Sequence, residues 1–453
     1  IIISPEVLSL GQDVTIRMNV SNTGGSAAEG VVPSSLIKLG TGDIVYSSGP
    51  QPGSQIIPAA ANRWFTWIYT ASDSGSIAVN GNVTGYSEYS KATRTSSASD
   101  SNYITVESPA QLSSSIHIPQ AKNIGQWFTV TMVVTNTGDA DAENVLPSSL
   151  TLQGTGGAVL MTSQPMPSAQ TVPGSGGAVS YEWTYSAAGT GIVYFEGNAS
   201  GNDKNSGETV SSLLTAGNNM TIQTPANLAM TLSAAPSIAG TGYEITVTGM
   251  INNTGQAPAD NVSVSTLDYV EIDISGGSVS LASGDMPTVL ITLNGGSSVS
   301  YTWIYTAGTA GTVNFTANAR GTDRNTGLDI ASADAASNNV EIRDAAFLAN
   351  SVLIEPSVIS RGQNFTVIMD VENQGDGDAA HVRSDSIVLF GTGAYNIVSG
   401  PLPQEQLLAA QTGGSITWIY TSTGAGVIGV SANAIGYDMN VGITVTASAA
   451  ESN

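Results

Sequence analysis

Cysteine is absent from the 453-residue sequence, and basic residues are scarce, with 12 Lys plus Arg against 35 Asp plus Glu. The absence of cysteine excludes a disulfide framework, a thiol nucleophile and a thiolate metal site. The formal net charge of −23 repels the phosphates of nucleic acids and the head groups of anionic lipids. We therefore expect no nucleic-acid partner.

Long hydrophobic runs are absent as well. No apolar stretch approaches the ~18 residues that a membrane-crossing helix needs, so we expect no membrane insertion. Charged residues amount to only 10% of the chain, and Gly, Ser, Thr and Asn are abundant instead. This composition resembles that of exported surface proteins, so we expect an extracellular or cell-surface location. The sequence starts at Ile1 and not at Met, which indicates a mature, processed or excerpted chain.

One aromatic hexapeptide occurs four times, at intervals of about 115 to 120 residues. The four copies are FTWIYT at 65–70, YEWTYS at 181–186, YTWIYT at 301–306 and ITWIYT at 416–421. An Asn follows the Trp of each copy at a constant interval, and these residues are Asn82, Asn198, Asn318 and Asn433. An Asn-x-Gly turn precedes each copy, at 22–24, 136–138, 253–255 and 373–375. Self-similarity at a fixed period indicates four repeats of one structural unit.

Apolar and polar residues alternate before each of these turns, along 14–20, 128–134, 245–251 and 365–371. Alternation with a period of two is typical of a strand with one buried face. Short strands separated by Gly, Pro, Asn and Ser predict an all-β fold of four tandem immunoglobulin-like β-sandwich domains in an elongated rod. The predicted domains are repeat 1 at 1–108, repeat 2 at 109–224, repeat 3 at 225–344 and repeat 4 at 345–453.

The recurring Trp residues allow two interpretations. Phe65, Trp67 and Tyr69 share one face of a predicted strand. They either fill the core of their sandwich or form a sugar-binding platform. Their recurrence beside apolar strands in all four repeats favours the core.

The segment "GQDVTIRMNVSNTG" at 11–24 recurs as "GQWFTVTMVVTNTG" at 125–138 and "GQNFTVIMDVENQG" at 362–375. This pattern resembles the CARDB-type and related immunoglobulin-like tandem repeats of bacterial and archaeal cell-surface proteins. Repeat 3 departs from it, with "AGTGYEITVTGMINNTG". The resemblance implies a β-sandwich used as a spacer, adhesive or assembly module.

Residues suited to catalysis are not gathered anywhere in the sequence. The two histidines, His117 and His381, occupy non-equivalent positions of different repeats. No Ser stands in a G-x-S-x-G motif, and Gly-rich stretches such as 154–157 lack the Lys-Ser/Thr of a phosphate loop. We therefore expect no enzymatic activity.

Repeats 2 to 4 share an Asp-x-Asn-x-Gly pattern five residues after the recurring Asn. Alternating oxygens of this kind begin calcium-binding loops, whereas Asp and Asn are also usual in hairpin turns. The bidentate Glu of a full calcium loop does not recur, which favours the turn. We expect no cofactor, with Ca²⁺ as the alternative. The candidate calcium ligands are Asp203, Asn205, Asp323, Asn325, Asp438 and Asn440.

Eight Asn residues precede x-Ser/Thr and are candidate glycosylation sites. Strands rich in Asn and Thr also produce such triplets by chance. The eight are Asn19, Asn82, Asn198, Asn219, Asn252, Asn261, Asn314 and Asn364.

Repeat 4 is predicted to lack its last strand. In repeat 3 that strand begins near Asn338, and the equivalent position of repeat 4 is Asn453. A sandwich without its last strand exposes an edge that is a template for another chain. We expect this edge to be filled by another copy through strand addition, or by a continuation of the same polypeptide.

The apolar run Ile1, Ile2 and Ile3 is the candidate donor strand. Alignment of Gly11 with Gly125 instead places this run in the first strand of its own repeat, where it aligns with 115–117 of repeat 2. Both roles remain open at this point.

These observations favour a non-enzymatic extracellular structural protein. It would be a subunit of a surface filament, stalk or layer that assembles end to end, with other copies of itself as partners. The alternative is an adhesin or glycan-binding surface module, with glycans as partners.

Four sandwiches placed end to end, with strands that rise roughly 3.3 Å per residue, predict a rod about 150 Å long. Small-angle scattering of the purified chain should give the distance distribution of such a rod. A compact globular distribution would contradict the prediction.

Overall fold

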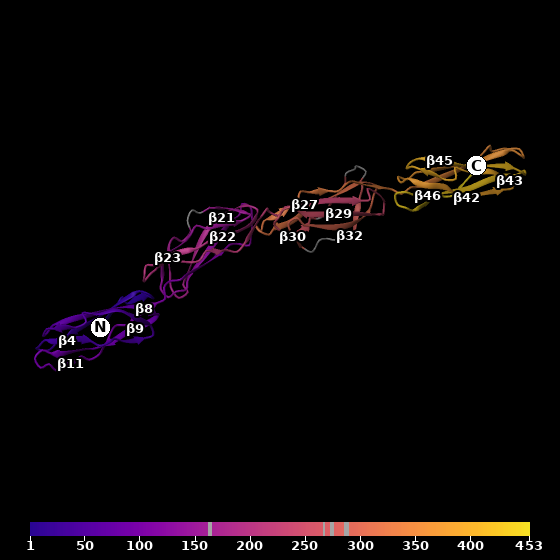
Figure 1. Cartoon of the computed structure of the whole chain (residues 1–453). Coiled ribbons are helices and arrows are strands. Elements are labelled where there is room, and N and C mark those ends of the chain that lie inside the picture. The colour runs from indigo at the N-terminus through magenta and orange to yellow at the C-terminus, as the bar shows by residue number, and fades with distance from the viewer. Residues whose placement is uncertain (162–164, 266–267, 272–275, 285–289) are drawn as a thin grey trace. The chain divides into compact units, whose positions relative to one another are not determined.

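Strands account for all the regular secondary structure in the described part of this computed structural model, and no helix occurs there (Figure 1). The structure describes residues 1–161, 165–265, 268–271, 276–284 and 290–453. The predicted all-β fold is confirmed. The chain forms two compact units, Ile1–Thr224 and Pro225–Asn453.

Repeat 1 contains three sheets, with strand orders β1-β3-β8-β6, β11-β10-β4-β7 and β12-β9-β13-β2. In addition, β5 pairs with β9. The strands are β1 (Ile2–Ser4), β2 (Val7–Ser9), β3 (Asp13–Ser21), β4 (Ala28–Pro33), β5 (Ile37–Gly40), β6 (Asp43–Gln51), β7 (Gln55–Ile57), β8 (Asn62–Asp73), β9 (Gly75–Gly81), β10 (Val83–Ser87), β11 (Thr93–Thr95), β12 (Ser99–Asp100) and β13 (Ile104–Glu107).

Repeat 2 has the sheet orders β14-β16-β21-β19, β15-β26-β22-β18 and β20-β17-β23-β24, and β25 pairs with β22. Its strands are β14 (Leu112–His117), β15 (Ala121–Asn123), β16 (Trp127–Asn136), β17 (Ala142–Pro147), β18 (Thr151–Gly154), β19 (Gly157–Leu160), β20 (Gln170–Val172), β21 (Ala178–Gly189), β22 (Gly191–Gly197), β23 (Ala199–Asp203), β24 (Thr209–Ser211), β25 (Thr215–Ala216) and β26 (Met220–Gln223).

Repeat 3 has the sheet orders β27-β29-β34-β32, β28-β39-β35-β31 and β33-β30-β36-β37, and β38 pairs with β35. Its strands are β27 (Leu228–Ala235), β28 (Ile238–Gly240), β29 (Glu244–Asn253), β30 (Ala259–Val264), β31 (Asp268–Glu271), β32 (Val279–Gly284), β33 (Ile291–Leu293), β34 (Ser298–Ala307), β35 (Gly311–Ala317), β36 (Ala319–Asp323), β37 (Asp329–Ala331), β38 (Ala335–Ala336) and β39 (Val340–Arg343).

Repeat 4 contains two sheets, β40-β41-β45-β43 and β44-β42-β46-β47, and β48 pairs with β46. Its strands are β40 (Leu348–Glu355), β41 (Asn364–Asn373), β42 (Ala379–Gly391), β43 (Tyr395–Leu402), β44 (Gln406–Leu408), β45 (Gly413–Ser422), β46 (Ile428–Asp438), β47 (Thr444–Thr446) and β48 (Ala450–Glu451).

One antiparallel pair is common to all four repeats and carries the repeated motif. The alternating strand before each Asn-x-Gly turn pairs with the Trp-containing strand, as β3 with β8 and β16 with β21. Directly opposite residues include Ile16 and Trp67 in repeat 1, and Val130 and Trp183 in repeat 2. This register points the alternating apolar residues and the Trp to the same face of the sheet.

Among the residues that the structure describes, four hydrophobic clusters lie behind these pairs. They draw on residues within 3–106, 110–222, 226–342 and 346–447. Each cluster contains one of the recurring Trp residues, and these are at most 4% exposed. The interpretation of the Trp residues as core filling is confirmed.

The departure of repeat 3 from the common pattern has a packing reason. Gly249 stands where the other repeats have Met18, Met132 and Met369. A Cβ at position 249 would lie 2.9 Å from Cζ3 of Trp303. Leu232 Cδ2 and Met230 Cε would each lie 3.1 Å from it, so these three side chains leave no room for a Met at this position.

Trp183→Ala should lower the free energy of unfolding by about 3–5 kcal/mol, because it empties a large aromatic site in a packed core. The matched control is Trp127→Ala, whose side chain is 64% exposed. That change should stay within about 0.5 kcal/mol. Urea denaturation followed by circular dichroism measures both, and similar losses for the two variants would contradict the core assignment.

Candidate assembly site

The site is the first part of β46 in repeat 4. This part of the strand has a neighbouring strand on one side and none on the other. On one side β42 pairs with the whole strand, from Ile428 opposite Gly391 to Asp438 opposite Ala379. On the other side β47 and β48 pair with the later residues, as far back as Ser431. The Ser452 N–H then donates to the Val430 carbonyl at 2.7 Å. No strand of 345–453 pairs with 426–428 on this side.

The other three repeats hold a strand at this place. In repeat 3, β39 runs antiparallel to β35, with Gly311, Thr312 and Val313 opposite Ile342, Glu341 and Val340. The same strand runs parallel to β28 on its other side. Repeats 1 and 2 have the same arrangement, with β13 between β9 and β2 and β26 between β22 and β15.

The strand fills its slot with two buried side chains in alternation. Val340 and Ile342 are at most 2% exposed, and the counterparts in the other repeats are buried to the same degree. These counterparts are Ile104, Val106, Met220 and Ile222. The slot therefore takes an apolar-x-apolar strand.

In repeat 4 the slot is an open groove of about 490 Å³. Its walls include Ile354 and Phe365 from the sandwich, Val427 and Ile428 from the β46 edge, and Val358 from the facing segment. Val427 is 75% exposed and Val358 87% exposed. The facing residues 358–360, which correspond to β28 of repeat 3, form no strand.

Asn453 takes the place in repeat 4 that Asn338 has in repeat 3. Its side-chain oxygen accepts the Ile354 N–H at 3.0 Å, and the Asn338 oxygen accepts the Ala234 N–H at 2.9 Å. Asn453 therefore marks the position after which β39 follows in repeat 3. Its part in assembly remains a prediction.

Ile1, Ile2 and Ile3 lie in their own repeat. Ile2 and Ile3 of β1 are opposite Arg17 and Ile16 of β3. Ile3 is buried, while Ile2 is 54% exposed. A donor role for this run would require it to leave its place beside β3.

The Asp of the Asp-x-Asn-x-Gly pattern is a buried hydrogen-bond acceptor in repeats 2 to 4. One oxygen of Asp203 accepts the N–H and the hydroxyl of Ser206, at 2.7 and 2.8 Å. The other oxygen accepts the N–H of Ala110, 93 residues earlier, at 2.8 Å. Asp203 therefore ties a hairpin turn to the segment through which the chain enters the repeat.

Asp323 and Asp438 make the equivalent contacts. Asp323 accepts the Ala226 N–H at 2.6 Å and the Thr326 N–H at 2.9 Å. Asp438 accepts the N–H groups of Ala346 and Val441. These tethers were not predicted from the sequence, although an Ala and an Asp recur together in three repeats.

Ca²⁺ binding by these loops remains a prediction. The oxygens of Asp203 that a cation would need already accept hydrogen bonds from N–H and O–H groups of Ala110 and Ser206. Within the described ranges no cluster of three or more acidic or His side chains is arranged to hold a metal. Asn205 and Asn440 lie in the same turns as their Asp residues, and each N–H donates to that Asp. Asn325 is the equivalent residue of repeat 3.

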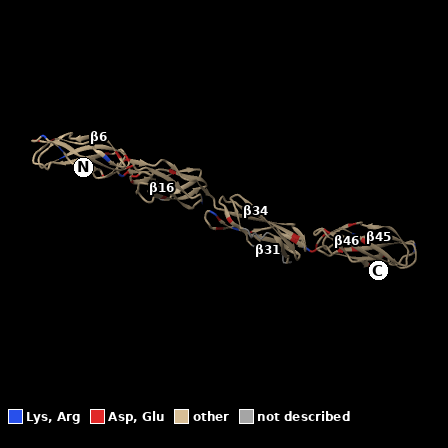
Figure 2. Ribbon diagram, turned by 90° about the horizontal axis from the view of Figure 1, so that it is seen from below, with Lys and Arg blue, Asp and Glu red and all other residues tan. Residues whose placement is uncertain are grey.

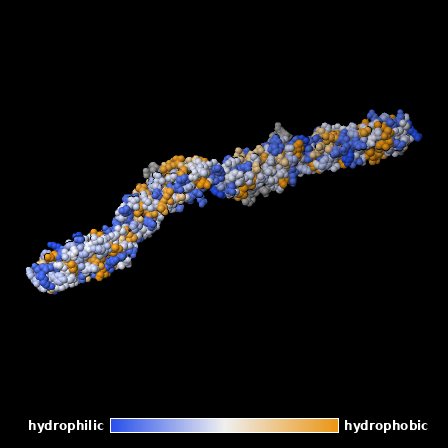
Figure 3. All heavy atoms as spheres, viewed as in Figure 1, coloured by the Kyte–Doolittle hydropathy of each residue, from blue (hydrophilic) through white to orange (hydrophobic). Residues whose placement is uncertain are grey.

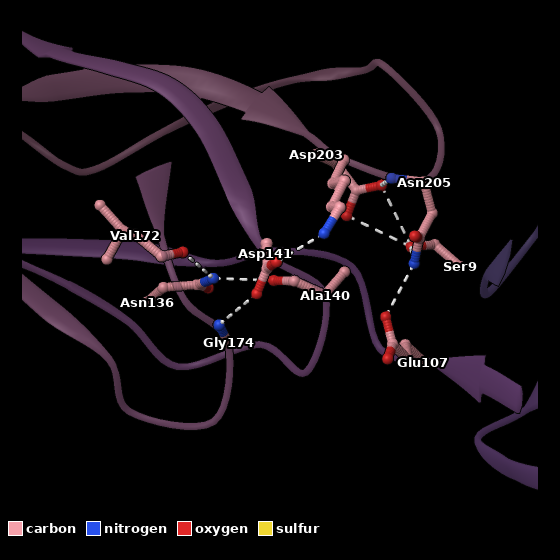
Figure 4. A network of polar contacts seen from close by, with 10 residues as sticks. Ser9, Glu107, Asn136, Ala140, Asp141, Val172, Gly174, Asp203 and Asn205 are labelled. Carbon is pink, nitrogen blue, oxygen red and sulfur yellow. Dashed lines mark hydrogen bonds and ion pairs between the residues drawn. The ribbon is translucent and has the colours of Figure 1, made fainter. Parts of the chain in front are cut away.

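Asp203 also joins repeats 1 and 2 through a polar network (Figure 4). The Ser9 hydroxyl donates to the Asp203 carboxylate at 3.1 and 3.2 Å. The Asn205 side-chain N–H₂ donates to Ser9 Oγ at 3.2 Å and to Glu107 at 2.9 Å. Ser9 is 1% exposed. At the equivalent joint of the second unit, Val441 packs against Gly240.

The candidate glycosylation sites differ in exposure. Asn19, Asn219, Asn261 and Asn364 are exposed, and Asn82, Asn198, Asn252 and Asn314 are partly buried. At the recurring Asn position, the main-chain N–H donates to a Ser hydroxyl, from Asn82 to Ser34 and from Asn198 to Ser148. The Asn that recurs after each Trp thus lies where the main chain makes this hydrogen bond in repeats 1 and 2. Glycosylation remains a prediction.

The two histidines are far apart in sequence and lie in separate compact units. The exposed His381 contacts Glu405 at 3.1 Å, and His117 is an exposed residue at the end of β14. Charged residues are sparse along the ribbon (Figure 2). Within the described residues, no helix is long and apolar enough to cross a membrane.

No family model and no curated protein matches the sequence. Similar solved structures include a protein of unknown function from Porphyromonas gingivalis W83, with 14% identity and a TM-score of 0.19, over 49% of this chain and 99% of that chain. The native conformation of Escherichia coli alpha-2-macroglobulin has 11% identity and a TM-score of 0.20, over 99% of this chain and 31% of that chain. This chain thus spans less than a third of that protein.

The C-terminal domain of the Streptococcus pyogenes antigen I/II-family protein AspA has 9% identity and a TM-score of 0.21, over 50% of this chain and 99% of that chain. Likenesses at these TM-scores carry no argument about this chain. The functional argument rests on its own contacts.

Asp203 should make repeat 2 sensitive to acid. Burial raises the pKa of Asp203, but hydrogen bonds from Ala110 and Ser206 outweigh it and hold the pKa below the ordinary 3.8. The ionised form therefore stabilises the fold fully above about pH 4, and this contribution is lost as the pH falls through the folded-state pKa.

Asp203→Ala should cost about 2–4 kcal/mol at neutral pH, because it leaves buried N–H groups without an acceptor. It should also remove part of the stability that is lost as the pH falls below about 4. Denaturant titrations across that range measure both effects. Glu208→Gln, in the same hairpin but exposed, is the control, and an equal cost for this variant would contradict the tether.

Proposed function

We propose that the protein is a non-enzymatic extracellular structural protein, a subunit of a surface filament, stalk or layer. In this proposal four tandem immunoglobulin-like sandwiches form an elongated rod, and copies join end to end by strand addition at the open edge of repeat 4. The resemblance of 11–24 and its copies to CARDB-type repeats supports the domain assignment. The observation that carries the assembly proposal is the groove between 426–428 and 358–360.

The groove fits a strand for two physical reasons. First, two segments face each other across it, and in the other repeats a single strand pairs with both. Unpaired backbone groups at a sheet edge are a template for another chain. Second, burying two aliphatic side chains of an incoming strand yields roughly 3–6 kcal/mol before the cost of association is subtracted.

The edge carries little of the protection that monomeric sheet proteins use. Lys and other charged residues usually guard an exposed edge, whereas Gly426, Val427 and Ile428 are uncharged, and the charged Arg361 lines the groove from its facing side. Apolar residues appear elsewhere on the visible face in small scattered groups (Figure 3). The edge of repeat 4 is distinguished from these groups by its open backbone.

The proposal is tested by filling the groove from within. The chain is extended after Asn453 by Asn-Val-Glu-Ile-Arg, the sequence that follows Asn338 in repeat 3. The extension should occupy the groove of its own repeat, abolish concentration-dependent assembly in sedimentation, and remove fibres from negatively stained samples. Assembly by the unextended chain is the reference.

An extension of Asn-Asp-Glu-Ser-Arg is the matched control, because it keeps the length but not the two apolar side chains. It should leave assembly intact. If the unextended chain stays monomeric at high concentration, or if both extensions assemble equally, the proposal fails. Glycan binding without assembly would favour an adhesin.

A further inference from the structure

Repeat 1 has an aromatic side chain on the outer face of its principal sheet, at a position where the other repeats have a small polar one. Trp64 precedes the buried Phe65 in β8, so its side chain points away from the core. It is half-buried on that outer face. Its counterparts are Ser180, Ser300 and Ser415. Packing of the core therefore does not explain this Trp.

Asn19 of β3 lies directly opposite Trp64. The Cβ atoms of such a pair are about 4.5–5.5 Å apart on one face of the sheet, so the amide and the indole are neighbours. Asn19 is exposed, and Ser21 completes an Asn-x-Ser triplet. Repeat 1 thus combines a candidate glycosylation site with an adjacent aromatic ring.

The exposure of this position is a property of the outer face and does not depend on what lies beside β3 in the sheet. In repeats 3 and 4 a strand flanks the equivalent position, since Met250 is opposite Thr231 and Asp370 is opposite Ser351. Met250 is nevertheless 39% exposed, and Asp370 is exposed as well. A group attached to Asn19 therefore projects into solvent whether or not a strand flanks it.

Arg17 adds a hydrogen-bond donor to the same face. Its guanidinium carbon lies 4.7 Å from the centroid of the Trp64 ring, where cation–π attraction favours it. Arg17 is exposed and stands two residues before Asn19 in β3, so both side chains point to the outer face. A guanidinium carries five N–H donors. The surroundings of Asn19 therefore offer an apolar ring and hydrogen-bond donors, which match the C–H face and the hydroxyl groups of a sugar.

The other seven candidate glycosylation sites lack this arrangement. In the described strand pairings none of them has an aromatic residue directly opposite: Asn252 is opposite Ser298, and Asn364 is opposite Thr421. The Asn364 side chain already accepts a hydrogen bond from the Thr421 hydroxyl at 2.5 Å. The side-chain oxygen of Asn314 is buried. Asn19 is therefore the site at which the protein surface best fits an attached sugar.

We propose that Asn19 carries an N-linked glycan whose first sugar packs its C–H face against Trp64 and accepts hydrogen bonds from Arg17. The donor is an oligosaccharide on a lipid diphosphate, and a transferase of the cell that recognises Asn-x-Ser/Thr catalyses the step. The amide nitrogen of Asn19 forms a bond to the anomeric carbon and loses one proton. The bond from that carbon to the diphosphate oxygen breaks, and the diphosphate leaves with the electron pair. This inference is independent of the assembly proposed for repeat 4.

The first test uses the protein purified from the organism that makes it. After denaturation, trypsin releases the peptide 18–38, in which Asn19 is the one Asn of an Asn-x-Ser/Thr triplet. Mass spectrometry should find this peptide with a hexose- or hexosamine-containing glycan on Asn19. An unmodified peptide in all molecules would overturn the inference.

The second test asks whether the sugar contacts Trp64. The variant Trp64→Ser introduces the residue of the other repeats and keeps the triplet, so Asn19 should still be glycosylated. Asn19→Gln removes the glycan in either background. Hydrogen exchange in β8 should become about fivefold faster when the glycan is removed from the chain with Trp64, and should change little in the Trp64→Ser background.

The control is the same set of four proteins produced in a host without such a transferase. There the two substitutions should act independently, because no sugar links the two positions. Equal coupling in both hosts would show a contact between the Asn19 and Trp64 side chains alone and would overturn the sugar contact. Independent substitutions in the glycosylated proteins would overturn it as well.

Discussion

The hydrogen bonds of one buried amide hold each complete repeat together where the chain enters it. In repeat 2 the Asn136 side chain donates to the carbonyls of Ala140 and Val172 and accepts N–H groups from Gln111 and Gly138. A buried polar side chain is tolerated only when its donors and acceptors are satisfied. The hydrogen-bond partners of the Asn136 side chain are main-chain groups of several segments. None of these segments can shift without leaving a buried polar group unpaired.

The nearby Asp203 carboxylate completes the same entry point. It fixes the Ala110 N–H from the opposite side, and Ala110 and Leu112 then pack into the core. Hydrogen bonds and apolar packing thus hold the entry segment, the Asn-x-Gly turn and the hairpin together. Repeat 4 has the same complete entry point, since Asp438 accepts the Ala346 N–H and Asn373 accepts the Phe347 N–H, and its open groove lies at the place of the last strand instead.

The sequence predicted the strands and the core well, because both leave a periodic signal. The alternation along 128–134 and the recurrence of Trp183 depend on which face is buried, and burial is visible in residue type. The Asn-x-Gly signal was recognised only as a turn. The partners of Asn136 are main-chain groups, which have no sequence signature, so its role required the structure.

The lack of a sequence signature for main-chain contacts also decides what could be predicted about repeats 4 and 1. The open edge of repeat 4 could be predicted from residue spacing, because Asn453 aligns with Asn338. The place of Ile1, Ile2 and Ile3 was left open, since an apolar run fits both a donor strand and the first strand of its own repeat. Only the pairing register of β1 with β3 shows where the run lies. The Asp-x-Asn-x-Gly pattern was likewise visible in the sequence. The contact between Asp203 and Ala110 was not, because the partner group is a backbone N–H.

Repeat 1 differs from the others at one further position of this entry point. Ser87 stands where they have Asp203, Asp323 and Asp438, and its hydroxyl lies 3.5 Å from that of Ser26. A hydroxyl does not change its charge between neutral and acidic conditions, whereas a carboxylate does. Acid that protonates Asp203 and loosens the entry point of repeat 2 therefore leaves this acceptor of repeat 1 unchanged. The first two repeats of one chain thus respond differently to acidification of their surroundings.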